Sequence, residues 1–197
     1  MTKNRLEAFS DGVIAIIITI MVLELRPPHG SSWHELRELT PKFAAYILSY
    51  IYLGIYWNNH HHLMHTVERV DGAIMWANLH LLFWLSVVPF TTAWMGEFPG
   101  TTEPAMLYGF SLLMAALGYT ILVRTIIAEQ LQHSGGKHSK LRDLVGADKK
   151  GLVSLAIYVT GGAFAVVNAW IAYALFATVA MIWLIPDRRI SKNVDKP

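Results

Sequence analysis

Long apolar stretches, separated by short polar segments, dominate the pattern of the chain. The stretches from Gly12 to Leu23 and from Gly72 to Met95 contain no Asp, Glu, Lys or Arg. An α-helix rises ~1.5 Å per residue and the hydrocarbon core of a bilayer is ~30 Å thick, so a crossing helix needs about 20 mostly apolar residues. The pattern therefore predicts apolar helices over about 8–25, 41–57, 72–95 and 104–128.

The last third of the chain predicts two more helices. Gly151 to Pro186 is 36 residues long without one Asp, Glu, Lys or Arg. A single helix of that length would reach ~54 Å, far beyond the ~30 Å core. A turn at Asn168 leaves 17 residues before it and 18 after it. We therefore expect helices over 151–167 and 169–186.

The prediction is one all-α domain over 1–197, a six-helix transmembrane bundle. Uncharged runs of this length lack the two-residue alternation that is typical of barrel strands. The distribution of positive charge predicts the orientation of the bundle, because cytoplasmic segments carry an excess of Lys and Arg. With the N-terminus inside, the outer segments hold only Arg26, Arg37 and Lys42, and the inner segments hold the other 13 of the 16 Lys and Arg residues. We therefore expect a multi-pass protein of the cell membrane with both termini cytoplasmic.

Composition excludes several classes of function. The chain has no cysteine, so it has neither disulfides nor thiolate sites. It contains no Gly-x-Ser-x-Gly motif, no phosphate-binding glycine motif and no basic stripe for nucleic acid. We expect no enzyme, no cofactor, no resident metal and no nucleic-acid partner. The polar segment 129–150 is expected to be a cytoplasmic connector, with membrane lipids as its possible contacts through their anionic head groups.

Polar residues at the start of the first predicted helix allow two interpretations. Charge within a membrane helix costs up to ~3 kcal/mol at the centre, so Asp11 needs a partner. Ser10 and Asp11 could satisfy the start of the helix, where the helix dipole favours an acid. Alternatively, they could belong to a buried polar network that locks helices together.

A second polar cluster follows the second predicted helix. His60 and His61 lie there, and Asn78 lies early in the next helix. In the predicted topology these residues reach the same membrane level as Asp11, which allows a hydrogen-bond network. The spacing of His61 and His65 also permits a metal site on one helix face, because His is the commonest metal ligand.

The first predicted helix carries an apolar stripe. Ile16, Ile20 and Leu23 recur at i, i+4 and i+7 with Thr19 beside them, so they share one face. Ile16 lies near the middle of the 8–25 range. The period alone does not distinguish a face that meets lipid, a neighbouring helix or a pore.

At this point the sequence resembles a known family. Arg5-x-x-x-Phe9-Ser10-Asp11, followed by Gly12-Val13-x-Ala15-Ile16-x-x-Thr19, is similar to the signature of the transmembrane protein 175 family of cation channels. The resemblance continues through four later motifs: Trp57-x-x-His60-His61, Asn78, Pro89-Phe90 and Trp183-x-x-Pro186-Asp187-Arg188-Arg189.

The resemblance implies a passive, potassium-permeable leak channel that assembles as a homotetramer. It implies that the first helix of each subunit lines the pore, with Ile16 as the gate, Ile20 and Leu23 on the lining face and Thr19 as the selectivity residue. K⁺ and other monovalent cations would be the permeating ions.

The resemblance also implies a structural polar network, made up of Arg5, Phe9, Ser10, Asp11, His60, His61 and Asn78. The chain has no Thr-Val-Gly-Tyr-Gly loop, so a carbonyl-type selectivity filter is not expected. We therefore expect modest selectivity for K⁺ over Na⁺.

Three other classes stay open on the residues themselves. A proton- or cation-coupled secondary transporter could use Asp11 and the histidines as a relay. A membrane metalloprotein could use the histidines as ligands, and a membrane protein of this pattern could also be purely structural.

Overall fold

The computed structural model describes residues 2–136, 138–146 and 148–184, and all regular structure within these ranges is helical. Six long helices are joined by three short connections and by two longer ones, each of which contains a short helix. The long helices are α1 (Lys3–Leu23), α3 (Thr40–His65), α4 (Gly72–Glu97), α5 (Thr102–His133), α7 (Lys149–Ala165) and α8 (Ala169–Leu184). The short helices are α2 (Trp33–Glu38) and α6 (Lys140–Val145). The prediction of an all-α fold is confirmed.

Each of the six long helices overlaps one of the six predicted ranges. α7 ends at Ala165 and α8 begins at Ala169, on either side of the predicted turn at Asn168. The end predicted for the last helix, at Pro186, lies outside the described residues. α3 continues to His65, so the histidine cluster is part of the helix itself.

The position of Asp11 corrects one interpretation. α1 begins at Lys3, five residues before the predicted start, so Asp11 lies in its third turn. The helix dipole acts on charges within the first turn. The interpretation of Asp11 as a residue that satisfies the helix start is therefore wrong.

Short polar side chains explain where several helices begin. The backbone N–H of Ile74 donates to the Asp71 carboxylate at 2.8 Å at the start of α4, and that of Gly151 donates to Asp148 at 2.8 Å at the start of α7. The Asn168 side chain accepts from the N–H of Trp170 at 2.9 Å where α8 begins. Each contact satisfies one of the N–H groups that a helix N-terminus leaves free.

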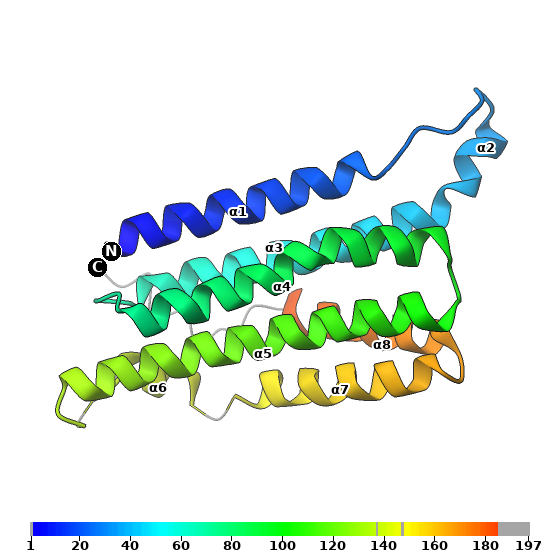
Figure 1. The fold of residues 1–197 in the computed structure, drawn as a ribbon. Helices are drawn as coiled ribbons and strands as arrows, with labels where there is room; N and C mark the ends of the chain where they lie inside the picture. The colour runs from blue at the N-terminus through cyan, green and yellow to red at the C-terminus, as the bar shows by residue number, and fades with distance from the viewer. Residues whose placement is uncertain (1, 137, 147, 185–197) are drawn as a thin grey trace.

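The long helices form an up-and-down bundle with α1 at one edge (Figure 1). α1 packs against α3 and α4, while α4 packs against α5 on its other side. α5, α7 and α8 pack against one another and close the opposite side of the bundle. The core is therefore built around α3, α4 and α5, and α1 is added to it from outside.

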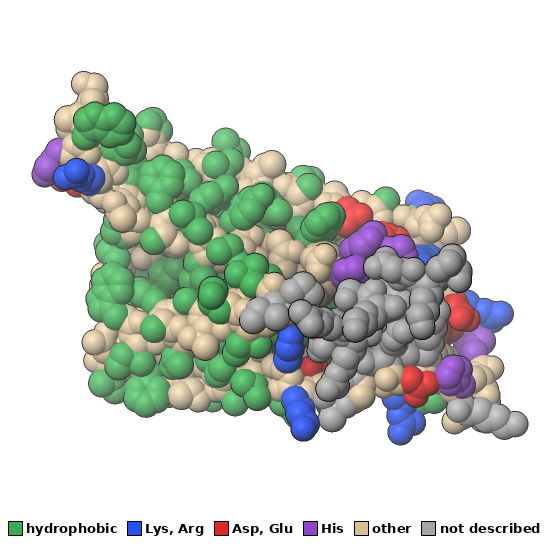
Figure 2. All heavy atoms as spheres, turned by 180° about the vertical axis from the view of Figure 1, so that it is seen from behind, with side chains coloured by type: hydrophobic (Ala, Val, Ile, Leu, Met, Phe, Trp, Pro, Cys, Tyr) green, Lys and Arg blue, Asp and Glu red, His purple; other side chains and the backbone are tan. Residues whose placement is uncertain are grey.

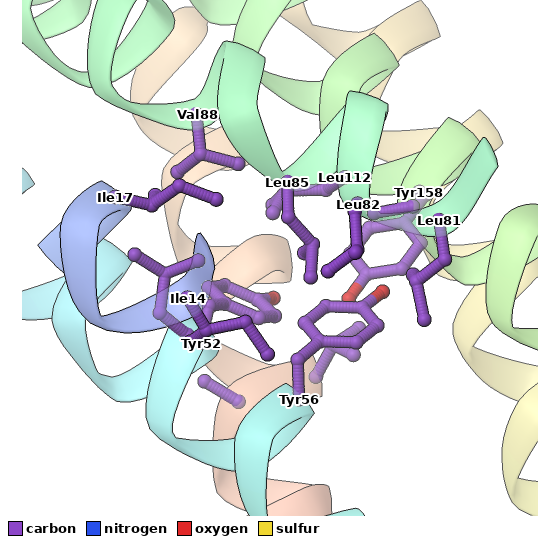
Figure 3. Close-up of a cluster of buried hydrophobic side chains, with 14 of the residues drawn as sticks. Ile14, Ile17, Tyr52, Tyr56, Leu81, Leu82, Leu85, Val88, Leu112 and Tyr158 are labelled. Atoms are coloured by element: carbon purple, nitrogen blue, oxygen red, sulfur yellow. The ribbon is translucent and has the colours of Figure 1, made fainter. Parts of the chain in front are cut away.

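Aliphatic and tyrosine side chains fill the space between these helices (Figure 3). Ile14 and Ile17 of α1 point toward Leu85 and Val88 of α4, and all four are at most 3% exposed. The hydroxyl of Tyr52 donates to the carbonyl of Phe176 at 2.5 Å, so the tyrosine polar group is satisfied within the core. Close packing of these aliphatic side chains holds α1 against α4.

The outer surface is largely apolar. Figure 2 shows hydrophobic side chains across the middle of one face, with charged side chains and histidines gathered at one end and at the α2 corner. Large apolar side chains are exposed, among them Phe83 at 58% and Met181 at 63%. α1, α4 and α5 are long and apolar enough to cross a membrane, and α8 is a shorter apolar helix of 16 residues. An apolar surface of this kind suits contact with lipid.

Phe176 of α8 occupies a notch formed by two glycines. Gly109 of α5 and Gly161 of α7 both face the Phe176 ring, which is fully buried. A Cβ added at Gly161 would lie 2.6 Å from the ring atom Cε1. The absence of a side chain at both positions therefore lets α8 approach α5 and α7 closely.

Gly161→Ala should consequently destabilise the bundle. Overpacking of this kind typically costs about 1–3 kcal/mol of the free energy of unfolding. The matched control is Gly162→Ala, because a Cβ at Gly162 meets nothing within 4 Å. Alanine at Gly162 should leave stability unchanged or raise it by up to about 1 kcal/mol through helix propensity. Thermal unfolding of the purified proteins in detergent measures both, and equal stability of the two variants would contradict the tight notch.

Candidate functional site

One face of α1 is buried against the rest of the bundle. Its five buried residues recur at intervals of four, four, three and four residues, so they form one stripe: Leu6, Ser10, Ile14, Ile17 and Met21. Four of these are aliphatic or thioether side chains, and Ser10 alone is polar. The buried face of α1 is therefore held by apolar packing and by one buried polar contact.

That contact is a chain of hydrogen bonds through three helices. His60 of α3 lies with Nε2 2.8 Å from the amide oxygen of Asn78 on α4. The Asn78 amide nitrogen donates to the Ser10 hydroxyl of α1 at 2.9 Å, and Ser10 donates to the carbonyl of Leu6 at 2.9 Å. His60, Asn78 and Ser10 are all 0% exposed.

The direction of this chain assigns the His60 tautomer. Because the Asn78 nitrogen faces Ser10, its oxygen faces His60, and Nε2 of His60 must carry the donated proton. Each donor in the chain therefore faces an acceptor. Polar side chains between helices in lipid contribute on the order of 0.6–2 kcal/mol per bond, so this chain both fixes and specifies the docking of α1.

Asp11 takes part in a separate contact. The indole Nε1 of Trp57 donates to the Asp11 carboxylate at 3.1 Å, which joins α1 to α3 nearer the surface. Asp11 is half-buried and Trp57 is exposed. The candidate network of the sequence is thus divided, with Ser10, His60 and Asn78 in the buried part and Asp11 beside it.

His61 belongs to a third group, which includes a residue that the sequence reasoning missed. Its Nδ1 lies 3.1 Å from the carboxylate of Glu7 on α1, and its Nε2 lies 3.0 Å from Nε2 of His65. Glu7 precedes Asp11 by four residues and so shares its helix face. That spacing is the signal by which Glu7 could have been found.

Arg5 and Phe9 lie apart from these contacts. At ~100° per residue, their positions fall within about 60° of Ile16, Ile20 and Leu23 around the helix. Phe9 is 49% exposed, and among the described residues no side chain forms a hydrogen bond or ion pair with Arg5. The structure therefore places both residues on the exposed side of α1, away from Asn78 and His60.

The exposed side of α1 carries the residues that the sequence analysis singled out for the pore. Ile16 is 59% exposed, Ile20 45% and Leu23 76%. Val13, Ile16 and Ile20 also line a surface groove whose other wall comes from Pro89 and Phe90 of α4. No helix of the described residues covers this apolar stripe.

Thr19 lies at the edge of the stripe and is exposed. Its hydroxyl donates to the carbonyl of Ile16 at 2.8 Å. Because the hydroxyl proton is used within the helix, the lone pairs of the oxygen remain available to a ligand outside it. The side chain can therefore offer an oxygen to a cation.

Comparison with known proteins gives this geometry its context. Residues 5–89, which include most of α1, all of α2 and α3 and the first part of α4, match the family model described as endosomal/lysosomal potassium channel TMEM175. A potassium channel of Chryseobacterium sp. (strain P1-3) is 53% identical over 194 residues, which cover 98% of each chain. The chain belongs to the TMEM175 family.

A solved structure and a longer relative extend the comparison within the TMEM175 family. The crystal structure of a lysosomal potassium-selective channel TMEM175 homologue from Chamaesiphon minutus superposes with a TM-score of 0.80 at 25% identity, over 94% of this chain and 98% of that one. The human endosomal/lysosomal proton channel TMEM175 is 23% identical over 91% of this chain and 37% of its own length. TMEM175 proteins are channels, which confirms the prediction that the chain is no enzyme.

The buried hydrogen-bond chain of this TMEM175 member yields a stability prediction. Asn78→Ala removes both bonds that Asn78 makes and leaves the buried Nε2–H of His60 unpaired, while the Ser10 hydroxyl keeps only its bond to the Leu6 carbonyl. We expect a loss of about 1–3 kcal/mol in the free energy of unfolding, the usual cost of a buried unsatisfied group.

Thermal unfolding in detergent measures this loss. Asn58→Ala is the matched control, because Asn58 is an exposed asparagine of α3 close to the same level. Its stability should equal that of the wild type. If the two variants unfolded at the same temperature, the chain through Asn78 would not contribute to the docking of α1.

Proposed function

We propose that this protein is a passive, potassium-permeable cation channel in which α1 from each of four subunits lines a central pore. The observation that carries the proposal is the apolar stripe of α1, in which Ile16, Ile20 and Leu23 are exposed among the residues that the structure describes. Membership of a channel family supports it, as do relatives whose names describe potassium channels.

A homotetramer gives the uncovered stripe a partner. A single chain offers one helix to the axis and cannot enclose a pore by itself, whereas four copies of α1 can surround one. The groove between Ile16 and Ile20 of α1 and Phe90 of α4 offers each subunit a surface on which the α1 of its neighbour can pack. An exposed apolar face of a membrane protein can pack against another apolar helix.

In this arrangement Ile16 forms the gate. Four Ile16 side chains would form an apolar collar, and a narrow apolar constriction resists ions because it loses its water. Ile20 and Leu23 continue the lining along the same stripe. Ions pass when the collar widens enough to hold water.

Thr19 supplies the oxygen ligands. Four hydroxyls, one from each subunit, would form a ring close to the collar, each with its proton bonded to the Ile16 carbonyl of its own helix. A single ring replaces only part of the hydration shell of an ion, whereas a ladder of backbone carbonyls replaces most of it. We therefore assign modest selectivity for K⁺ over Na⁺, with permeation of other monovalent cations.

We further propose that the six long helices cross the cell membrane and that both termini are cytoplasmic. The six ranges match the helices in position, and the 13 Lys and Arg of the inner segments outnumber the three of the outer segments. Ser10, Asp11, His60, His61 and Asn78 then act by holding α1 in place from its far side, outside the path of the ions.

Flux measurement in liposomes distinguishes a channel from a coupled carrier. With a potassium gradient and a controlled membrane potential, a channel should pass current that follows the driving force without coupling to a pH gradient. Saturation of flux with potassium, together with proton coupling, would instead favour the secondary transporter.

Ile16→Asn should increase resting potassium flux. The polar side chain wets the collar, and a fall of ~1.4 kcal/mol in the barrier corresponds to a tenfold rise in rate. Val22→Asn is the control, because Val22 is 45% exposed on the same helix but faces away from the stripe. Potassium-dependent flux in liposomes measures both variants. Unchanged flux in Ile16→Asn, or an equal rise in Val22→Asn, would remove Ile16 from the gate.

Thr19→Val should abolish most discrimination between K⁺ and Na⁺ while the tetramer remains intact. Valine keeps the shape of threonine but lacks the oxygen, so the permeability ratio should fall toward unity. Thr19→Ser retains the hydroxyl and should retain the selectivity. Reversal potentials in defined potassium and sodium solutions test this, and persistence of wild-type selectivity in Thr19→Val would show that another group selects the ion.

A further inference from the structure

We propose that Glu7, His61 and His65, here called the Glu7 cluster, form a binding site for a divalent transition metal of the Zn²⁺ class. One ligand atom from each residue lies within 4.8 Å of the other two. The cluster joins the second turn of α1 to the last two turns of α3. It lies outside the proposed ion path, because Glu7 and the pore-lining stripe are on different faces of α1.

The hydrogen bonds of the cluster determine which nitrogens can bind a metal. The Glu7 carboxylate can only accept, so Nδ1 of His61 must carry the proton in their 3.1 Å contact. In the neutral ring this leaves a free lone pair on Nε2 of His61. Nε2 of His65 lies 3.0 Å from that atom and therefore donates its proton to it. A metal ion would bind both Nε2 atoms once the Nε2 proton of His65 has moved to its Nδ1, because a neutral imidazole that ligates through Nε2 carries its proton on Nδ1.

The distance between the two nitrogens suits a shared metal ion. Zinc–nitrogen bonds of ~2.0–2.1 Å with a tetrahedral angle hold two ligand nitrogens about 3.3 Å apart. The observed separation is 3.0 Å, so a shift of a few tenths of an ångström suffices. The i, i+4 spacing on one helix face keeps both rings on the same side of α3.

Glu7 completes an arrangement that metal sites commonly use. A carboxylate that receives the second N–H of a ligating His fixes its tautomer and orientation and raises its basicity. The His61 ring also stacks on Trp57, with ring centroids 6.4 Å apart. The negative end of the α3 dipole favours a cation at this site, because both histidines lie near the helix C-terminus.

The site is open enough for an ion to enter. The side chains of His61 and Glu7 are 43% and 21% exposed, and His65 is exposed. Two nitrogens from the protein leave the remaining coordination positions to water, because the Glu7 carboxylate accepts from Nδ1 on the other side of the His61 ring. Imidazole ligands favour Zn²⁺, Cu²⁺ and Ni²⁺ over Mg²⁺ and Ca²⁺.

A bound ion would tie α1 to α3. This consequence rests on the proposed function, since α1 is the helix proposed to line the pore. Its movement during opening would be restrained by a metal that holds His61 and His65 on α3 next to Glu7 on α1. Micromolar zinc should therefore lower potassium flux in liposomes.

The decisive experiment measures metal binding itself and needs no ion flux. Full-length protein carrying a tag without histidine is purified in detergent, treated with chelator and titrated with Zn²⁺ by calorimetry. We expect one zinc ion per chain in the wild type. His65→Ala should weaken binding at least tenfold, and Glu7→Gln, which keeps an acceptor for His61 but removes the charge, should weaken it about tenfold.

His34→Ala is the matched control, because His34 also lies next to a carboxylate, that of Glu38, on a helix at the other end of α1. It should bind zinc as the wild type does, and all variants should elute alike on size exclusion. Absence of zinc binding in the wild type, or wild-type affinity in His65→Ala, would overturn the site. Zinc binding that requires His65 but leaves potassium flux unchanged would support the site and overturn its restraint on α1.

Discussion

The hydrogen-bond chain from His60 through Asn78 to Ser10 is the constraint on which the placement of α1 depends. Apolar packing holds α1 against α4, but aliphatic side chains tolerate small rotations and shifts along the helix axis. A directed chain of donors and acceptors does not, because each bond requires a particular partner at about 3 Å. The three residues therefore specify which face of α1 is buried and, by the same means, which face is left exposed.

The contrast between the two faces of α1 follows from this constraint. Ser10 sits among Leu6, Ile14 and Ile17 on the buried side, so the stripe that contains Ile16 and Leu23 must point away from the bundle. A rotation of one residue, about 100°, would take Ser10 out of the buried stripe and leave the amide nitrogen of Asn78 without its acceptor, while the bond between Asn78 and His60 would remain. A buried polar cluster can thus determine the orientation of an exposed apolar surface on the opposite side of the same helix.

Hydropathy and charge predicted the helices well, because both depend on whether a segment suits lipid or water. The turn at Asn168 could be located from length alone, since 36 uncharged residues exceed one bilayer crossing. Pairings between side chains were harder to predict. Asp11 forms a hydrogen bond with Trp57, and His61 forms one with Glu7. These pairings depend on how α1 is rotated against α3, which the spacing of residues within either segment does not show. α1 also begins earlier than hydropathy predicts, because Lys3, Arg5 and Glu7 continue the helix beyond its apolar part.

The notch that receives Phe176 has a consequence for how the molecule can deform. Three helices that interlock around one aromatic ring, with two glycine backbones pressed against it, leave little room to slide, so α5, α7 and α8 behave as a stiff unit. α1 lies on the opposite side of the bundle and packs mainly against two neighbours, α3 and α4. Deformation of the bundle is therefore expected to be smaller among α5, α7 and α8 than between α1 and its two neighbours.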